Sequence, residues 1–64
     1  MTEPAELFAQ LTGEIEDLHG IAIAGQGGDL STDERAFYCA QVCSGLKQLN
    51  ATVRSIKTAL GSTS

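Results

Sequence analysis

Apolar residues recur through the second half of the chain at alternating spacings of three and four positions. The series comprises Cys39, Val42, Leu46, Leu49, Val53, Ile56 and Leu60. Side chains three and four positions apart lie on the same face of an α-helix, so the series predicts one narrow apolar seam along a single long helix. We expect this helix to span about residues 31–60 and to be followed by a frayed tail at 61–64.

The first half of the chain carries a second series with the same alternating spacing. Its members are Phe8, Leu11, Ile15, Leu18 and Ala22, with Leu7 and Ile21 widening the stripe on one flank. The pattern predicts a helix over about residues 3–24. Thr2, Glu3 and Pro4 are typical of a helix start, where a capping hydroxyl, a negative charge and a proline are all favourable. Residues 21–24 also alternate as a short strand would, so the pattern leaves open whether the helix continues through Gly20.

Glycines between the two predicted helices indicate a reversal of the chain. Gly25, Gly27 and Gly28 lie close enough together to end the first helix in a left-handed cap and to turn the chain over residues 25–30. Ser31 and Glu34 then form the Ser-x-x-Glu pattern of a capping box, in which each side chain bonds a backbone N–H near the other residue. The second helix is therefore expected to begin at this serine.

Together these elements predict an all-α fold, an antiparallel two-helix hairpin that makes up one domain of 64 residues. A domain this small buries only roughly 60% of the surface that its unfolded chain exposes. The hairpin would also leave apolar or small side chains uncovered on the flanks of its seams, namely Leu7, Ile21, Tyr38, Cys43 and Ala59. We therefore expect two copies to associate into a four-helix bundle, with the two seams forming its core.

A local run of residues at the entry to the second helix supports this architecture. Leu30, Asp33, Glu34, Ala36 and Cys39 form the pattern Leu-x-x-Asp-Glu-x-Ala-x-x-Cys. Together with the chain length and the paired seams, the run resembles the Rop-type RNA-binding helical hairpin. This resemblance implies a hairpin that dimerises into a four-helix bundle. RNA binding in that family depends on a basic first helix with an exposed aromatic residue, which this chain lacks, so an RNA-binding regulator ranks third among our hypotheses.

The charges are divided unequally along the chain, whose formal net charge is −4. All acidic residues lie at or before Glu34, and all lysines and arginines lie at or after Arg35. Such a chain is a poor match for phosphate backbones, so nucleic acid is not an expected partner. The acids of the first helix are typical of a solvated helix face, and the alternative is an acidic docking face that includes Glu14, Glu16 and Asp17.

Three further residues do not fit a plain hairpin. Gly13 and Gly20 each cost about 1 kcal/mol relative to alanine in a helix interior. They lie on the face away from the seam, where Ala9 and Ala24 extend a lane of small residues that a partner helix could approach. The alternative is that the two glycines merely weaken the helix, or kink it at Gly20. Phe37 faces outward near the turn, where either the loop folds over it or it contributes to a binding hot spot.

His19, Cys39 and Cys43 are the only set of residues with metal-ligand character. A chain folded back around Gly27 would place His19 opposite roughly Ala36, about one helical turn from Cys39. The alternative is that both cysteines fill the core, because thiols four positions apart on one helix lack the loop spacing of zinc motifs. We expect no metal and no cofactor, and we keep a thiol-based metal or redox site as the second hypothesis.

The leading hypothesis is a small non-enzymatic adaptor or regulatory protein. No nucleophile, base and orienting group stand at a recognisable spacing, which argues against an enzyme. The expected partners are a second copy of the chain and an unidentified protein. The sequence has neither an N-terminal secretory signal nor an apolar stretch long enough to span a bilayer, so we expect a cytoplasmic protein without a membrane anchor.

Overall fold

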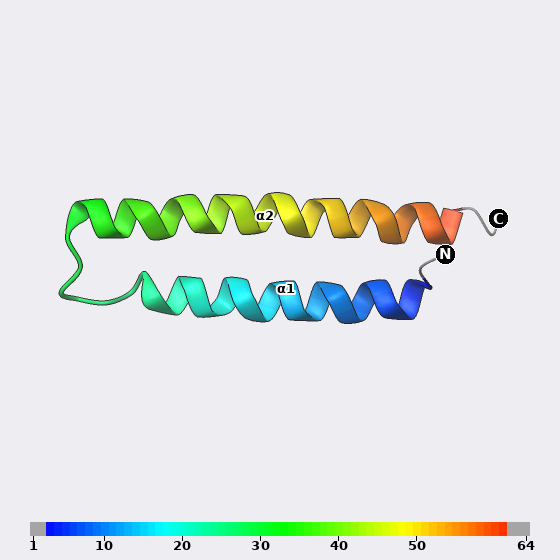
Figure 1. The fold of residues 1–64 in the computed structure, drawn as a ribbon, viewed down its shortest axis with the longest axis horizontal. Coiled ribbons are helices and arrows are strands. Elements are labelled where there is room, and N and C mark those ends of the chain that lie inside the picture. Colours follow the sequence, from blue (N-terminus) through cyan, green and yellow to red (C-terminus); the bar gives the residue numbers. More distant parts are fainter. Residues whose placement is uncertain (1–2, 62–64) are drawn as a thin grey trace.

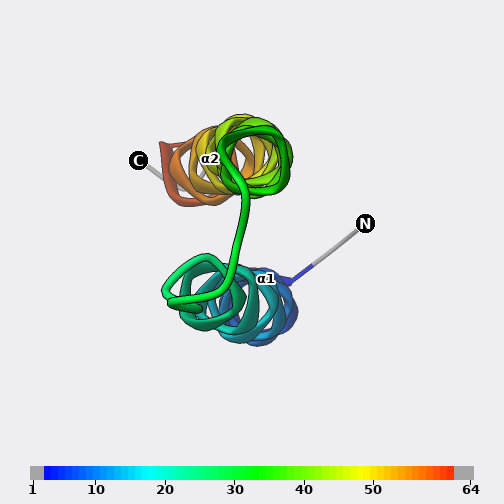
Figure 2. The same ribbon diagram turned by 90° about the vertical axis from the view of Figure 1, so that its left-hand side faces the viewer.

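The computed structural model of the protein, which describes residues 3–61, is an antiparallel hairpin of two helices. Helix α1 spans Pro4–Ala24 and helix α2 spans Thr32–Gly61. The two helices lie side by side along a rod 51 Å long and 15 Å across (Figure 1). Seen from the turn end, a single connection joins them (Figure 2). Gly61, predicted to begin the frayed tail, is the last residue of α2. The rest of the predicted tail, residues 62–64, lies outside the described residues.

Helix α1 is continuous through Gly20, so residues 21–24 are helical and form no strand. Pro4 occupies the first turn, where its missing N–H leaves no hydrogen bond unmade. The carbonyl of Glu3 accepts hydrogen bonds from the backbone N–H groups of Glu6 at 3.0 Å and Leu7 at 3.1 Å. The predicted capping residue Thr2 lies outside the described residues, and the Glu3 side chain makes no capping hydrogen bond.

The capping box at the start of α2 is confirmed. The backbone N–H of Ser31 donates to Glu34 Oε1 at 2.8 Å, and the backbone N–H of Glu34 donates to Ser31 Oγ at 3.1 Å. These bonds stabilise the ionised carboxylate, so the backbone of Ser31, and then its hydroxyl, hold the pKa of Glu34 below its ordinary value. The start of α2 is therefore determined by local sequence.

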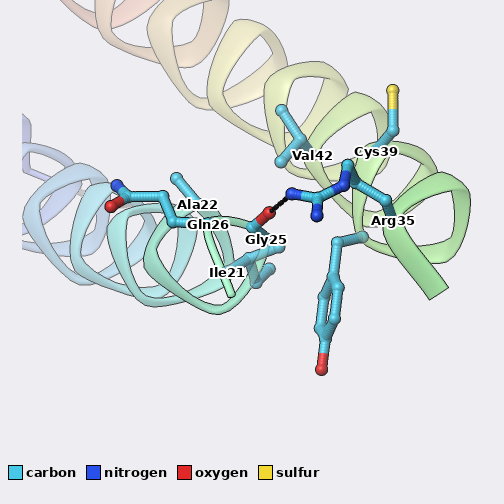
Figure 3. Close-up of a pocket in the computed structure, with 8 residues that line it drawn as sticks. Ile21, Ala22, Gly25, Gln26, Arg35, Cys39 and Val42 are labelled. Atoms are coloured by element: carbon cyan, nitrogen blue, oxygen red, sulfur yellow. Dashed lines mark hydrogen bonds between the residues drawn. The ribbon is translucent and has the colours of Figure 1, made fainter. Parts of the chain in front are cut away.

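The turn differs from the prediction at the end of α1. The expected left-handed glycine cap is wrong, since no glycine among the described residues has a positive φ. Gly25 keeps a right-handed conformation, with φ −69° and ψ −11°, and its N–H donates to the carbonyl of Ile21 at 3.0 Å. The Arg35 guanidinium donates to the carbonyl of Gly25 at 2.7 Å (Figure 3). It also donates to the carbonyl of Gly27 at 3.0 Å. A side chain of α2 thus satisfies two carbonyls of the turn that lie beyond the end of α1.

Replacing Arg35 by alanine is expected to lower the free energy of unfolding by about 1 kcal/mol, because two carbonyls of the turn lose a charged donor that is exposed to water. Urea denaturation at a fixed protein concentration measures this change. The control is Arg54→Ala, which removes the same group from an exposed position of α2 and should cost less than about 0.5 kcal/mol. Equal effects of the two substitutions would contradict a role for Arg35 in the turn.

The helices pack through one stripe on each side. The residues that are buried or half-buried along the two helices are Pro4, Leu7, Leu11, Glu14, Leu18 and Ile21 on α1, and Tyr38, Val42, Gly45, Leu49, Thr52, Ile56 and Ala59 on α2. We expected the two predicted seams to face each other in full. Only every second seam residue does so. The contact stripe of α1 is rotated toward the flank that begins at Leu7, and the contact stripe of α2 is rotated toward the flank that begins at Tyr38.

The register of the hairpin follows from its closest approaches. A Cβ built at Gly45 would lie 2.9 Å from Leu18 Cδ1, so a glycine allows the helices to come this close. Leu18 and Gly45 are therefore level, which places His19 beside Ser44 and not opposite Ala36 as expected. The physical reason is that Gly25, at the end of α1, lies against Tyr38, where its built Cβ would be 3.6 Å from Tyr38 Cβ. Helix α2 therefore begins six residues beyond the end of α1, and residues 25–31 span this offset (Figure 1).

Candidate functional site

An apolar surface of the hairpin is made of the seam residues that do not pack between the helices. We call this surface the apolar face and define it by Phe8, Ile15 and Ala22 on α1 and by Cys39, Leu46 and Val53 on α2. All six are exposed. Phe8 is 52% exposed, Ile15 50% and Leu46 50%, although each is a large hydrophobic residue. Leu60, also 50% exposed, continues the α2 stripe beyond the start of α1.

Both stripes lie on the same side of the hairpin. In each helix the exposed residues recur every seven positions and are displaced from the interhelical contacts in the same rotational sense. Because the helices are antiparallel, this displacement points to one common face. A hollow near the turn agrees with this placement, since Ala22 of α1 and Cys39 of α2 both line it, together with Val42 (Figure 3). The result is an apolar surface two helices wide.

The interhelical contact also contains a polar cluster, on its side away from the apolar face. Glu14 is half-buried between the helices, and Thr52 opposite it is only 3% exposed. The Thr52 hydroxyl donates to Glu14 Oε1 at 2.7 Å. Glu14 Oε2 accepts from Gln10 Nε2 and from Gln48 Nε2, both at 3.2 Å. This network links α1 to α2 at one register only, because sliding either helix by a turn would separate the carboxylate from its donors.

These donors stabilise the ionised form of Glu14. The hydrogen bond from Thr52, followed by those from Gln10 and Gln48, lowers the pKa of Glu14 against the opposing effect of partial burial. A carboxylate whose pKa is lower in the folded state stabilises the fold above its ordinary pKa. That contribution is lost as the pH falls through the lower pKa of the folded state. The hairpin is therefore expected to lose stability in acid, through Glu14 and also through Glu34.

Replacing Thr52 by valine is expected to raise the pKa of Glu14 toward its ordinary value, because the shortest hydrogen bond to the carboxylate disappears. A pH titration of the Glu14 side-chain carboxyl by NMR measures this shift directly. The control is Ser55→Ala, since the Ser55 hydroxyl belongs to the same helix but donates to the carbonyl of Ala51. An unchanged Glu14 titration in Thr52→Val would show that the cluster does not hold the carboxylate in solution.

The residues predicted to bind a partner are distributed over several surfaces. Glu14 turns its carboxylate toward α2, so its oxygens are engaged inside the hairpin, whereas Glu16 and Asp17 are exposed. Phe37 is 57% exposed and packs edge-to-face on Tyr38, with ring centroids 5.6 Å apart. It lines a second shallow hollow with Ile21 and with residues 40, 41, 44 and 45. The structure thus does not gather the predicted partner-binding residues into one site.

Gly13 and Gly20 both face open space, since a Cβ built at either glycine would meet nothing within 4 Å. Replacing both by alanine is expected to raise the free energy of unfolding by up to about 2 kcal/mol, because each glycine costs about 1 kcal/mol in a helix interior. Thermal unfolding followed by circular dichroism tests this. Gly45→Ala is the contrast, because its new Cβ would displace Leu18. A lower melting temperature for the double variant would mean that another helix packs on the two glycines.

The cysteines and the histidine do not come together. Cys39 and Cys43 are both exposed and carry free thiols. His19 is also exposed and lies level with Ser44 on the neighbouring helix. Among residues 3–61 no group of three or more His, Cys, Asp or Glu side chains could hold a metal ion. The hypothesis of a metal site within one chain therefore gains no support from the arrangement.

Sequence reasoning missed the residues that determine how the helices meet. Thr52, Gln10 and Gln48 form the polar cluster, Gly45 allows the close approach, and Arg35 joins the turn to α2. A signal was present for two of them: small residues at positions 45, 52 and 59 recur every seven positions, which marks a line of close helix contact. For Gln10, Gln48 and Arg35 the sequence offers no such signal, because long polar side chains are common on exposed helix faces.

Comparisons with known proteins found no matching protein-family model, no matching curated protein and no matching solved structure. The helical hairpin itself is compatible with the Rop-type architecture that the sequence resembles. Within the described residues, neither helix combines the length and the apolar character that crossing a bilayer requires.

Proposed function

We propose that this protein is a small non-enzymatic adaptor or regulator, which acts in the cytoplasm through self-association and contacts with other proteins. The observation that carries the proposal is the apolar face. Four large hydrophobic residues, Phe8, Ile15, Leu46 and Val53, are each between 39% and 52% exposed on one side of a hairpin of only 64 residues. Contiguous apolar surface of this kind marks a site of interaction in soluble proteins.

The small size of the hairpin supports the same proposal. Among the described residues only Leu7, Thr52 and Ile56 are buried, so the two helices alone form a very small core. A core of this size seldom outweighs the conformational entropy of the chain, and association is a common remedy in small proteins. A second hairpin placed on the apolar face would bury both stripes and produce the four-helix bundle expected from the sequence.

Protein partners other than a second copy would then bind the outward surfaces of the bundle. Glu16 and Asp17 are exposed on α1, whose described residues include no lysine or arginine. This surface suits a partner that presents basic residues, with electrostatic complementarity contributing mainly to the association rate and to specificity.

Native mass spectrometry of the reduced protein tests the proposal, because one spectrum gives both the number of subunits and any bound metal. A metal-free dimer at micromolar concentration is the expected result. Sedimentation equilibrium over a range of concentrations checks that the dimer also exists in solution. A monomer at micromolar concentration in both measurements would overturn the proposal, and a stoichiometric metal would favour the thiol-based alternative.

A further inference from the structure

The hollow beside Phe37 lies between the helices near the turn, on the side of the hairpin that carries the polar cluster. Its volume is about 470 Å³. Gln41, which lines it, lies seven residues before Gln48, whose amide donates to Glu14 in the polar cluster, so both glutamines lie on the same side of α2. The apolar face lies on the opposite side of the contact between the helices. A second copy bound to the apolar face would therefore leave this hollow open.

Phe37 forms an apolar wall of the hollow and is braced from behind. At 57% it is the most exposed of the large hydrophobic residues in the described chain, so the turn does not fold over it. Its ring packs edge-to-face on Tyr38, and Tyr38 in turn lies against Gly25, where a built Cβ would be 3.6 Å from Tyr38 Cβ. An aromatic side chain that is held in place before binding loses little conformational entropy when a partner covers it. Such residues are typical of binding hot spots.

The other lining residues leave room for a side chain of another protein. Ala40, Ser44 and Gly45 are small, and Ile21 of α1 supplies a second apolar wall opposite Phe37. An apolar cavity of about 150 Å³ is enough to hold a benzene ring. The hollow is larger than this and open to solvent, so it can accept a large aliphatic or aromatic side chain from outside.

Carboxylates flank the hollow along the rod. Asp33 precedes Phe37 by four residues on α2 and Asp17 precedes Ile21 by four residues on α1, so each aspartate lies one turn away on the same side of its helix. Both aspartates are exposed. In the register of the hairpin they lie about 20 Å apart along its axis, with the hollow between them. No lysine or arginine occurs among the described residues of α1, and Lys47 lies further round α2, on its outer side.

We propose that this hollow docks a basic amphipathic helix of another protein. The helix lies in the groove between α1 and α2, inserts one large apolar side chain against Phe37, and presents lysines or arginines to Asp17 and Asp33. Because the hollow lies between the two aspartates, the basic residues are expected one to two helical turns before and after the apolar anchor. The inference rests on the proposed function, for which it names the surface and the class of partner.

Charge favours this occupant over the others. The chain has a net charge of −4, so a further copy of it would bring mainly like charge to the acidic ends of the hollow. Nucleic acid would bring phosphates, which the same carboxylates repel. A basic helix instead gains in association rate and in specificity from the opposite charge.

A synthetic helical peptide tests the proposal. The probe has one tryptophan at its centre and lysines one and two helical turns before and after it, on the same face. The chain contains no tryptophan, so tryptophan fluorescence reports the peptide alone. We expect saturable binding, which Phe37→Ala weakens at least about 10-fold, because hot-spot aromatics contribute this much or more. The control Ile23→Ala truncates a residue that is 52% exposed outside the hollow and should leave binding unchanged.

The part played by charge is measured with a second pair of variants. Asp17→Asn with Asp33→Asn should weaken binding about five-fold at low salt, since exposed ion pairs are individually weak. Glu6→Gln with Glu16→Gln removes the same net charge from exposed positions of α1 outside the hollow and should have no effect. A matched peptide with glutamate in place of every lysine should not bind.

Three outcomes would overturn the docking of a basic helix. They are absence of binding by the lysine peptide, equal binding by wild type and Phe37→Ala, and equal binding by the glutamate peptide. A species larger than a dimer that Phe37→Ala abolishes would assign the hollow to a further copy and overturn it as well. Sedimentation equilibrium of the unmodified protein distinguishes these failures from that of the proposed function: a dimer leaves the proposed function standing, and a monomer overturns it.

Discussion

Replacing Leu46 by glutamate is expected to convert the protein from a dimer into a monomer at micromolar concentration. Leu46 lies at the centre of the apolar face and is 50% exposed in the hairpin, so the change places a carboxylate where a second copy would bury it. Burying an unpaired charge costs several kcal/mol. In an isologous dimer the substitution counts twice, so we expect the dissociation constant to rise by at least about 1,000-fold, equivalent to about 4 kcal/mol.

Sedimentation equilibrium measures this change. The control is Gln41→Glu, which adds the same charge to an exposed position of α2 outside the apolar face and should leave the dimer intact. Circular dichroism of both variants shows whether the helices persist, so that loss of the dimer can be told apart from unfolding of the hairpin. Equal dissociation constants for the two variants would mean that the apolar face is not the surface of association.

Replacing Ile56 by alanine is expected to lower the free energy of unfolding by about 3 kcal/mol, within the range measured for truncating a buried aliphatic side chain. Ile56 is 5% exposed and is one of the three buried residues of the described chain, with Leu7 and Thr52. A domain of this size has only a few kcal/mol of stability, so the variant should be largely unfolded at elevated temperature. Urea denaturation at a fixed protein concentration, followed by circular dichroism, gives the value.

The matched control is Ile23→Ala. It makes the same chemical change at a residue that is 52% exposed on the outer side of α1, so its cost should be less than about 0.5 kcal/mol. Alanine also has the higher helix propensity, which reduces the cost further. If the two substitutions destabilised the protein equally, the rotation of α2 about its axis would have to differ from the one described here.

The sequence by itself determined the helices and the place where the chain turns. These features depend on neighbouring residues: apolar spacing predicts each helix, Pro4 suits the first turn of α1, and the hydrogen bonds between Ser31 and Glu34 begin α2. The presence of more apolar surface than two helices can cover was also readable, because the seams and their flanks are wider than one contact stripe. Self-association remains a prediction drawn from that excess.

Only the tertiary structure decided which part of each apolar stripe faces the other helix. The predicted seams and the observed contact stripes share Leu11, Leu18, Val42, Leu49 and Ile56, and they differ in the neighbouring positions on either side. Helical periodicity cannot distinguish these rotations, because both bury residues at spacings of three and four. The choice depends on contacts between residues far apart in the chain, such as Leu18 against Gly45 and Thr52 against Glu14.

The register and the end of α1 were decided in the same way. The length of the turn alone does not determine which residues of α1 and α2 lie level with each other. The hydrogen bonds of Glu14 to α2 and the close approach of Leu18 to Gly45 fix this register, which places His19 away from Cys39. The glycines permitted a left-handed cap, but Gly25 stays right-handed, and Arg35, ten residues beyond Gly25, binds two carbonyls of the turn. Local sequence therefore determined the elements, and long-range side-chain contacts determined how those elements meet.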